Sequence, residues 1–176
     1  FALCDPNGQT LCFGLAKLAQ NHRAGLQGPV QHLTFAAKNV ESLVAFYQNR
    51  LGFLLTDRVL HDDGTVATAF LTSNHEHHTL ACFKSDRSGM DHHSYEAGDW
   101  GYIRDWCDHF ARHDIQLEWG PGRHGPGNNL FVFITDPDGN WIEVSAELEV
   151  IYDRGVVDWP QHPRTLNKWG RAIMRS

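Results

Sequence analysis

Histidine is the residue type that stands out in this chain, with 12 among 176 residues. A single histidine on a strand is usually an ordinary hydrogen-bonded residue. Two histidines at matching positions of a repeated pattern, with a carboxylate on a strand of the same sheet, point instead to a metal site, because strands hold side chains at fixed places. His32, His93 and Glu143 form such a set.

The chemistry of this set follows from its ligand types. Two imidazoles and one carboxylate suit Fe(II), with three positions of an octahedron left open for reactants. Zinc would accept the same three ligands together with one water molecule. The ligand types alone therefore leave both metals open.

A repeated pattern of strand and helix is expected to position these side chains. The stretches 30–53 and 91–115 each begin with a short alternating segment and continue with apolar residues at helical spacing. Asn39 and Asp99 are the expected N-caps, and Gly52 is expected to end the first helix. With the two stretches aligned from their first residues, His32 and His93 are each the third residue of the opening strand.

Three further strand-like segments follow each predicted helix. They lie at residues 53–60, 65–73 and 78–84 in the first unit, and at 115–121, 129–135 and 141–147 in the second. Turn sequences at 62–64 and 136–139 separate neighbouring strands. The sequence therefore predicts an α+β fold in which paired βαβββ modules form a curved mixed sheet around a metal cleft.

The turn and strand that carry Glu143 also occur at the start of the chain. "TDPDGNWIEVSAE" (135–147) is a near copy of "CDPNGQTLCFGLA" (4–16), and Cys12 lies opposite Glu143 when the two are aligned. We interpret the first copy as the end of an earlier unit that needs no metal ligand.

The composition argues against several classes of protein. A formal net charge of −6 argues against a broad basic surface for nucleic acid, so no nucleic-acid partner is expected. No stretch approaches the roughly 20 apolar residues that span a bilayer, so no membrane partner is expected. The four cysteines are widely spaced and are interpreted as reduced thiols of a cytoplasmic protein.

Four segments carry a resemblance to a known family: "PVQHLTF", "DHHSYEAGDW", "GPGRHGPGNNLFVFITDPDGNWIEV" and "PRTLNKWG". They resemble the two-domain extradiol ring-cleavage dioxygenases of the vicinal oxygen chelate superfamily, which share the glyoxalase/bleomycin-resistance fold. In that family the second of two similar domains is catalytic. The resemblance implies three regions: the end of a metal-free domain plus a linker (1–28), a catalytic domain of modules 29–88 and 89–148, and a C-terminal tail (149–176).

The resemblance also implies a metal and its ligands. Fe(II), with Mn(II) as the other candidate, would be bound by His32, His93 and Glu143. His92 is the rival of His93, since strand alternation directs only one of the two towards the cleft. The match to His32 favours His93.

Three further positions are assigned by the same resemblance. His78 matches an acid–base histidine beside bound oxygen, and His124 matches a histidine that hydrogen-bonds the substrate's oxygen. Phe133 stands where many members have a tyrosine that contacts the substrate. A phenyl ring cannot donate that hydrogen bond, so Phe133 departs from the family pattern.

The implied activity is cleavage of a catechol-type ring with O₂, by a protein expected to be a homo-oligomer. One alternative is a glyoxalase- or epimerase-type lyase or isomerase that uses Zn, Ni or Co. Such a site generally needs a second carboxylate, and the strand at 78–84 offers none opposite Glu143. Another alternative is a metal-free binding module for small molecules, in which the three matched side chains would be an accident.

Overall fold

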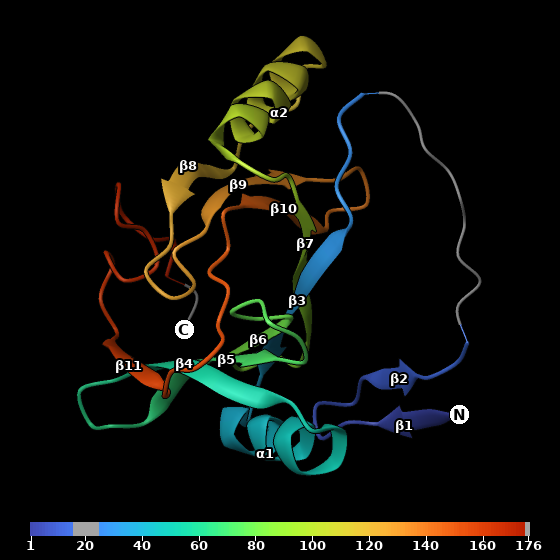
Figure 1. Ribbon diagram of the computed structural model, residues 1–176, viewed down its shortest axis with the longest axis vertical. Helices are drawn as coiled ribbons and strands as arrows, with labels where there is room; N and C mark the ends of the chain where they lie inside the picture. The colour runs from blue at the N-terminus through green and yellow to red at the C-terminus, as the bar shows by residue number, and fades with distance from the viewer. Residues whose placement is uncertain (16–24, 175–176) are drawn as a thin grey trace.

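One curved, mixed sheet with a helix on each half dominates the computed structural model, which describes residues 1–15 and 25–174 (Figure 1). Within these residues the sheet has nine strands in the order β11-β4-β5-β6-β3-β7-β10-β9-β8. The two ends of the sheet curl towards the same side, so that the sheet encloses a concave inner face. The predicted α+β fold is confirmed.

Two modules of identical topology make up this sheet. The first contains β3 (Val30–Ala37), α1 (Val40–Leu51), β4 (Leu54–Leu60), β5 (Val66–Thr72) and β6 (Leu80–Lys84). The second contains β7 (Gly89–Glu96), α2 (Trp100–Arg112), β8 (Trp119–Arg123), β9 (Leu130–Thr135) and β10 (Trp141–Ala146). In each module the last strand pairs in parallel with the first.

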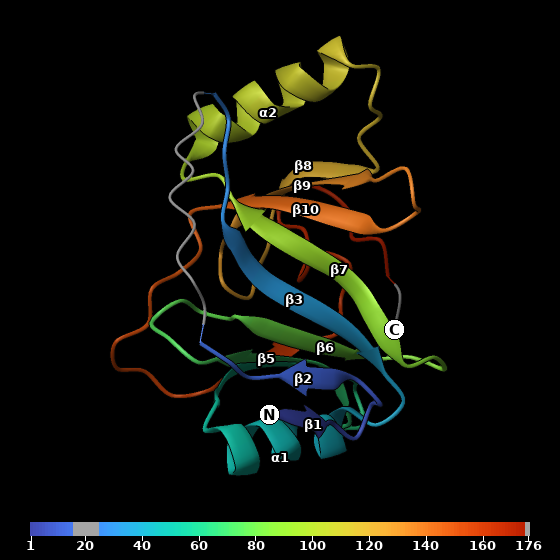
Figure 2. The same ribbon diagram turned by 90° about the vertical axis from the view of Figure 1, so that its right-hand side faces the viewer.

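The modules are joined by the antiparallel pairing of their first strands, β3 and β7. Figure 2 looks onto the outer side of these two strands, which run side by side between α1 and α2. The first strands, β3 and β7, lie at the centre of the sheet. The last strand of each module, β6 or β10, lies directly beside the first strand of the same module. Ligands from both modules can therefore meet on the inner face.

The first helix begins and ends where the sequence predicts. The side chain of Asn39 accepts a hydrogen bond from the backbone N–H of Ser42, and Gly52 ends the helix with a φ of 75°. Val40, Leu43 and Tyr47 form its buried face, which packs against the outer side of β3, β5 and β6. This packing leaves the opposite face of the same strands to line the interior.

The second helix is capped in a similar way, by the side chain of Asp99. Its residues Ile103 and Phe110 pack against β9 and β10. The sequence placed a strand at 115–121, whereas β8 begins only at Trp119. The intervening residues connect α2 to the sheet.

The segments outside the modules extend the fold at both ends. β1 (Ala2–Cys4) and β2 (Thr10–Cys12) form a separate hairpin. Its turn is built like the one before β10: one oxygen of Asp5 accepts from two backbone N–H groups, and one oxygen of Asp136 does the same. The N-terminal copy expected at 4–16 is described up to residue 15.

The C-terminal segment reaches the sheet through β11 (Val157–Pro160), which pairs in parallel with β4. The chain then continues along the open side of the concave face (Figure 1). Leu166 packs on the inner side of both halves of the sheet. The expected tail is thus in contact with the modules.

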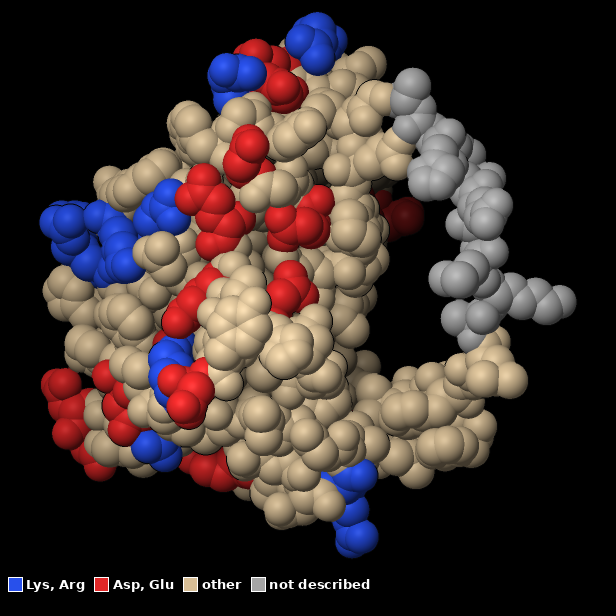
Figure 3. Space-filling view, viewed as in Figure 1, with Lys and Arg blue, Asp and Glu red and all other residues tan. Residues whose placement is uncertain are grey.

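The surface is mixed in charge on the face that Figure 3 shows, where acidic and basic side chains lie among each other. Among the described residues, no helix has the length and apolar character required to cross a membrane.

Candidate metal centre and active site

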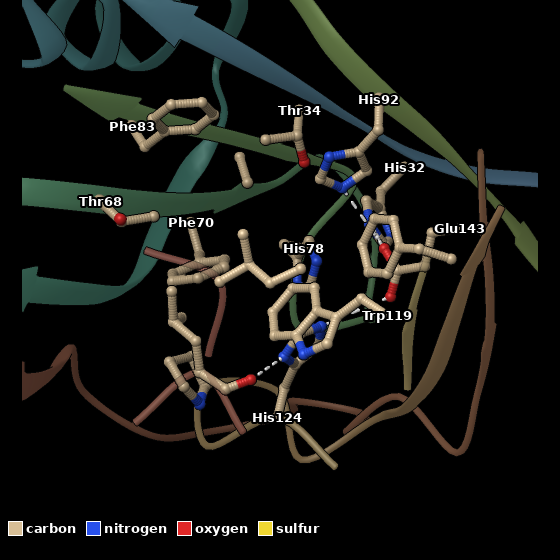
Figure 4. Close-up of a pocket in the computed structure, with 15 residues that line it drawn as sticks. His32, Thr34, Thr68, Phe70, His78, Phe83, His92, Trp119, His124 and Glu143 are labelled. Atoms are coloured by element: carbon tan, nitrogen blue, oxygen red, sulfur yellow. Dashed lines mark hydrogen bonds and ion pairs between the residues drawn. The ribbon is translucent and has the colours of Figure 1, made fainter. Parts of the chain in front are cut away.

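Three buried side chains converge on the inner face of the sheet: His32 from β3, His92 from β7 and Glu143 from β10 (Figure 4). One candidate ligand atom from each lies within 4.8 Å of the other two. Nε2 of His32 lies 2.9 Å from Oε2 of Glu143, and Nε2 of His92 lies 3.4 Å from the same oxygen. Two imidazoles and one carboxylate thus meet at one point, as a metal site requires.

The second histidine of this set is His92, and the expectation that it would be His93 is wrong. Thr34 lies opposite His92 in the β3–β7 pair, and Leu33 lies opposite His93. Directly opposite residues share a face of the sheet, and the faces alternate along a strand. His93 therefore shares the outer face with Leu33, and its ring lies 5.4 Å from the ring of Tyr95, measured between centroids.

The sequence did contain a signal for the correct choice. The helix N-caps Asn39 and Asp99 lie at equal distances along the chain from His32 and His92, respectively. Aligning the repeats on their caps, instead of on the first residue of each stretch, matches His32 to His92. The cap is the better anchor because its side-chain hydrogen bond fixes where each helix starts.

The surroundings of the three side chains fit a bound metal ion. Nδ1 of His92 lies 2.8 Å from a carboxylate oxygen of Asp91, which keeps Nε2 of the same ring for a ligand bond. Oε1 of Glu143 accepts a hydrogen bond of 3.2 Å from Asn129, which leaves Oε2 directed at the two imidazoles. The donor set and its outer partners therefore fit a catalytic metal ion.

Electrostatics favour the ligand forms of the carboxylate and of His32. Burial on its own raises the pKa of Glu143, but the His32 ring and contacts with His124 and His92 outweigh it and hold that pKa well below its usual range. Burial lowers the pKa of His32, with Glu143 opposing. Burial also acts to lower the pKa of His92, yet Asp91 and Glu143 overcome it and raise that pKa. The carboxylate is thus charged, which is the form that binds a cation.

His78 lies in the same pocket, next to the candidate ligands. It is buried, and the centroid of its ring lies 4.3 Å from that of His32 and 5.1 Å from that of Phe70. Burial, together with the neighbouring rings of His32 and His77, places its pKa well below the usual value. The ring is therefore held in its neutral form, in which one of its nitrogens is an acceptor.

His124 lies in the same pocket, close to Glu143. Its Nε2 lies 3.6 Å from Oε1 of Glu143, and its Nδ1 is hydrogen-bonded to the backbone carbonyl of Leu166. A carbonyl can only accept, so Nδ1 carries a proton. In the neutral form of the ring, Nε2 is then an acceptor for a hydroxyl group of a ligand.

Phe133 lies on β9 directly opposite Glu143 and forms part of an aromatic wall. Its ring stacks on Trp119, with centroids 5.2 Å apart, and meets the edge of the His92 ring at 5.0 Å. The structure therefore gives Phe133 an apolar packing role at the pocket wall.

The remaining walls were missed by sequence reasoning, because loops and the C-terminal segment supply several of them. These walls are mainly apolar, and no sequence motif marks them. The residues that form them are Thr34, Thr68, Phe70, Ala81, Phe83, Trp119, Pro126, Leu166 and Ile173. Strand alternation could have identified the β5 and β6 members, since Thr68 and Phe70 face away from α1.

Comparison with known proteins identifies relatives of this chain. A family model described as Glyoxalase/Bleomycin resistance protein/Dioxygenase superfamily matches residues 30–144. Metapyrocatechase 2 of Cupriavidus necator is 30% identical over 122 residues, which are 69% of this chain and 37% of that protein. The chain thus spans well under half the length of this curated relative.

Two solved structures share the fold. The Mn(II)-bound glyoxalase from Novosphingobium aromaticivorans superposes with a TM-score of 0.84 at 26% identity, covering 97% of this chain and 57% of that one. Homoprotocatechuate 2,3-dioxygenase from Arthrobacter globiformis superposes with a TM-score of 0.75 at 26% identity, covering 82% and 46%. The fold is therefore common to proteins of two named activities.

Proposed function

This chain belongs to the glyoxalase/bleomycin resistance protein/dioxygenase superfamily, and on that premise we propose that it forms the catalytic domain of an extradiol dioxygenase that cleaves a catechol ring with O₂. The observation that carries the proposal is the meeting of His32, His92 and Glu143 at the end of an apolar pocket. Two histidines and one carboxylate leave open positions on an Fe(II) ion for the two reactants.

We propose Fe(II) as the metal, with Mn(II) as the other candidate. When bound, the metal would bring the catechol and dioxygen together and allow electrons to pass between them. His32, His92 and Glu143 would hold it, with Asp91 and Asn129 orienting His92 and Glu143.

The chain's own residues would handle the protons. An unprotonated nitrogen of His78 can take the proton of one catechol hydroxyl group, and the electron pair of the O–H bond then stays on the oxygen. Nε2 of His124 can accept a hydrogen bond from the other hydroxyl and so fix the orientation of the ring. Phe133 offers no polar atom, so this orientation would depend on His124 alone.

The pocket walls favour a catechol whose substituent is uncharged and apolar. Beyond the histidines and Glu143, the described residues that line the pocket include neither Lys nor Arg nor a second carboxylate. Phe70 and Phe83 lie towards the end remote from Glu143, as Figure 4 shows. A carboxylate placed there would lose its hydration without a cationic partner, which is costly.

A glyoxalase-type lyase or isomerase is the second candidate, and the likeness to the Mn(II)-bound glyoxalase favours it. Its discriminating feature is a second carboxylate that would act as base or ligand. Among the described residues of the pocket, Glu143 is the sole carboxylate, which supports the dioxygenase.

The proposal is tested with the full-length protein, loaded anaerobically with Fe(II) and then exposed to air and an alkylcatechol. We expect a yellow ring-fission product and consumption of O₂. An enzyme that leaves catechols and O₂ untouched but converts a hemithioacetal would contradict the dioxygenase and support the glyoxalase.

A further inference from the structure

A line of three buried side chains runs from the pocket into the first module: His78, His77 and Asp57. Nδ1 of His78 lies 2.9 Å from Nδ1 of His77, and Nε2 of His77 lies 3.0 Å from Oδ2 of Asp57. The exposed fraction of His77 is 0% and that of Asp57 is 1%. Neither His77 nor Asp57 lines the pocket, so a role in contacting the substrate does not account for them.

The carboxylate at the end of the line is ionised. Asp57 Oδ1 accepts a hydrogen bond of 2.9 Å from Arg154, and Oδ2 accepts one of 2.7 Å from the indole N–H of Trp159. Burial raises the pKa of Asp57, but His77, Trp159 and Arg154 outweigh this and lower it below the usual value. A negative charge therefore faces Nε2 of His77.

These contacts determine where the protons lie. A carboxylate has only acceptor atoms, so the nitrogen that faces it at 3.0 Å, Nε2 of His77, carries a proton, although the pair falls outside hydrogen-bond geometry. In the neutral ring of His77, Nδ1 is then an acceptor. The 2.9 Å contact between the two Nδ1 atoms therefore needs a proton on Nδ1 of His78. Nε2 of His78 is left unprotonated.

We propose that Asp57 and His77 are positioning residues that fix neutral His78 in the tautomer protonated at Nδ1, so that its Nε2 lone pair is the one offered to the pocket. This inference rests on the proposed function for the use of His78 as a proton acceptor, but the tautomer itself can be measured without it. The geometry of the line thus sets which nitrogen of His78 faces the pocket as an acceptor.

The tautomer is read by NMR of the full-length protein labelled with ¹⁵N in the histidine rings, with diamagnetic Zn(II) added in place of iron. Two-bond and three-bond couplings to the ring carbons distinguish a protonated nitrogen from an unprotonated one. We expect a protonated Nδ1 and an unprotonated Nε2 for His78. Predominance of the Nε2-protonated form would overturn the proposal.

The variant Asp57→Asn removes the negative charge that determines which nitrogens of His77 and His78 carry protons. Its amide can donate to Nε2 of His77, which would place the His77 proton on Nδ1 and reverse the tautomer of His78. We expect the Nε2-protonated form of His78 to rise. Trp159→Phe is the matched control, because it removes the other hydrogen bond to Oδ2 but keeps the carboxylate, and it should leave the tautomer unchanged.

A second variant covers the case in which Asp57→Asn does not fold. His77→Phe keeps an aromatic ring in the buried site but removes the acceptor for Nδ1 of His78, so the fixed tautomer should again be lost. An unchanged tautomer in a folded variant of either kind would contradict the proposal.

Kinetics then separate this inference from the proposed function. With an alkylcatechol, Asp57→Asn should lower kcat by about 10- to 100-fold while KM stays within about twofold, because the substrate is held elsewhere. An expected tautomer in a protein without ring-cleavage activity would overturn the proposed function alone. Ring cleavage with the opposite tautomer would overturn the role of Asp57 and His77 alone.

Discussion

Glu143 and His32 touch across a strand: Oε2 of Glu143 lies 2.9 Å from Nε2 of His32, although β7 separates β10 from β3 in the sheet. Two side chains that reach over the same intervening strand leave room for one more ligand from that strand. His92 on β7 fills this place. The site therefore depends on the register of three adjacent strands.

The choice between the neighbouring histidines gives the first prediction. His92→Ala should lower the affinity for Fe(II) by more than about 100-fold, since loss of an outer partner alone typically costs about 10–100-fold. His93→Ala is the matched control and should change it by no more than about 0.5 kcal/mol, as for other substitutions away from the site. Anaerobic titration with Fe(II) measures both, and a larger effect of His93→Ala would contradict the assignment.

The contact between Asp91 and His92 gives the second. Asp91→Asn weakens the partner that orients the ring, so metal affinity should fall by about 10–100-fold while the fold is kept. Competition with a chelator gives the affinity, and circular dichroism checks the fold. Arg87→Gln, which removes an exposed partner of Asp91, should have a much smaller effect.

The walls of the pocket give the third. An alkylcatechol should bind at least about tenfold more tightly than a catechol of similar size bearing a carboxylate, because the buried charge would lack a partner. Calorimetry on the anaerobic, metal-loaded protein measures both affinities without turnover. Equal affinities would contradict the preference for an uncharged, apolar substituent.

The acid dependence of folding gives the fourth. The pKa of Asp57 is lowered in the folded state, so its contribution to stability is present above the unfolded value near 3.8 and is lost as pH falls through the folded pKa. Asp57→Asn should therefore be less stable than the parent at pH 6 by roughly 2–4 kcal/mol, with a smaller difference below pH 3.8. Urea unfolding of the metal-free protein over this range checks the sign; a difference that grows in acid would contradict it.

The cysteines give the fifth. Burial raises the pKa of the Cys82 thiol to about 12, so this thiol should react with a disulfide reagent only after unfolding. Cys4 and Cys12 are exposed and should react at once. Mass spectrometry of the protein labelled before and after denaturation identifies the modified residues.

Much of the fold was predictable because local signals agreed with the tertiary arrangement. Asn39 and Gly52 bound the first helix as expected, and the repeat predicted two modules in one sheet. His32 and Glu143 could be singled out because each lies on a strand with a single candidate ligand, and the structure brings the two side chains together. At His92 and His93 two candidates are adjacent, so an alignment shifted by one residue exchanged the inner and outer faces.

The rest of the site depends on long-range packing that no short motif encodes. Trp119 enters the pocket because β8 pairs with β9, and Leu166 does so because the chain turns back after β11. Asp57 lies far from His77 in sequence, and only the folded sheet places them in contact. The structure buries His77, which no motif of the sequence marks.

The C-terminal segment, which joins the sheet through the pairing of β11 with β4, contributes to the site in a different way from the two modules. The strands that would hold the metal belong to the duplicated modules, whereas Leu166 and Ile173 come from the single segment that follows them. Exchange of that segment between relatives would alter the shape of the pocket and leave the metal ligands untouched. Substrate range could therefore diverge in evolution, or be engineered, through one contiguous stretch of the gene.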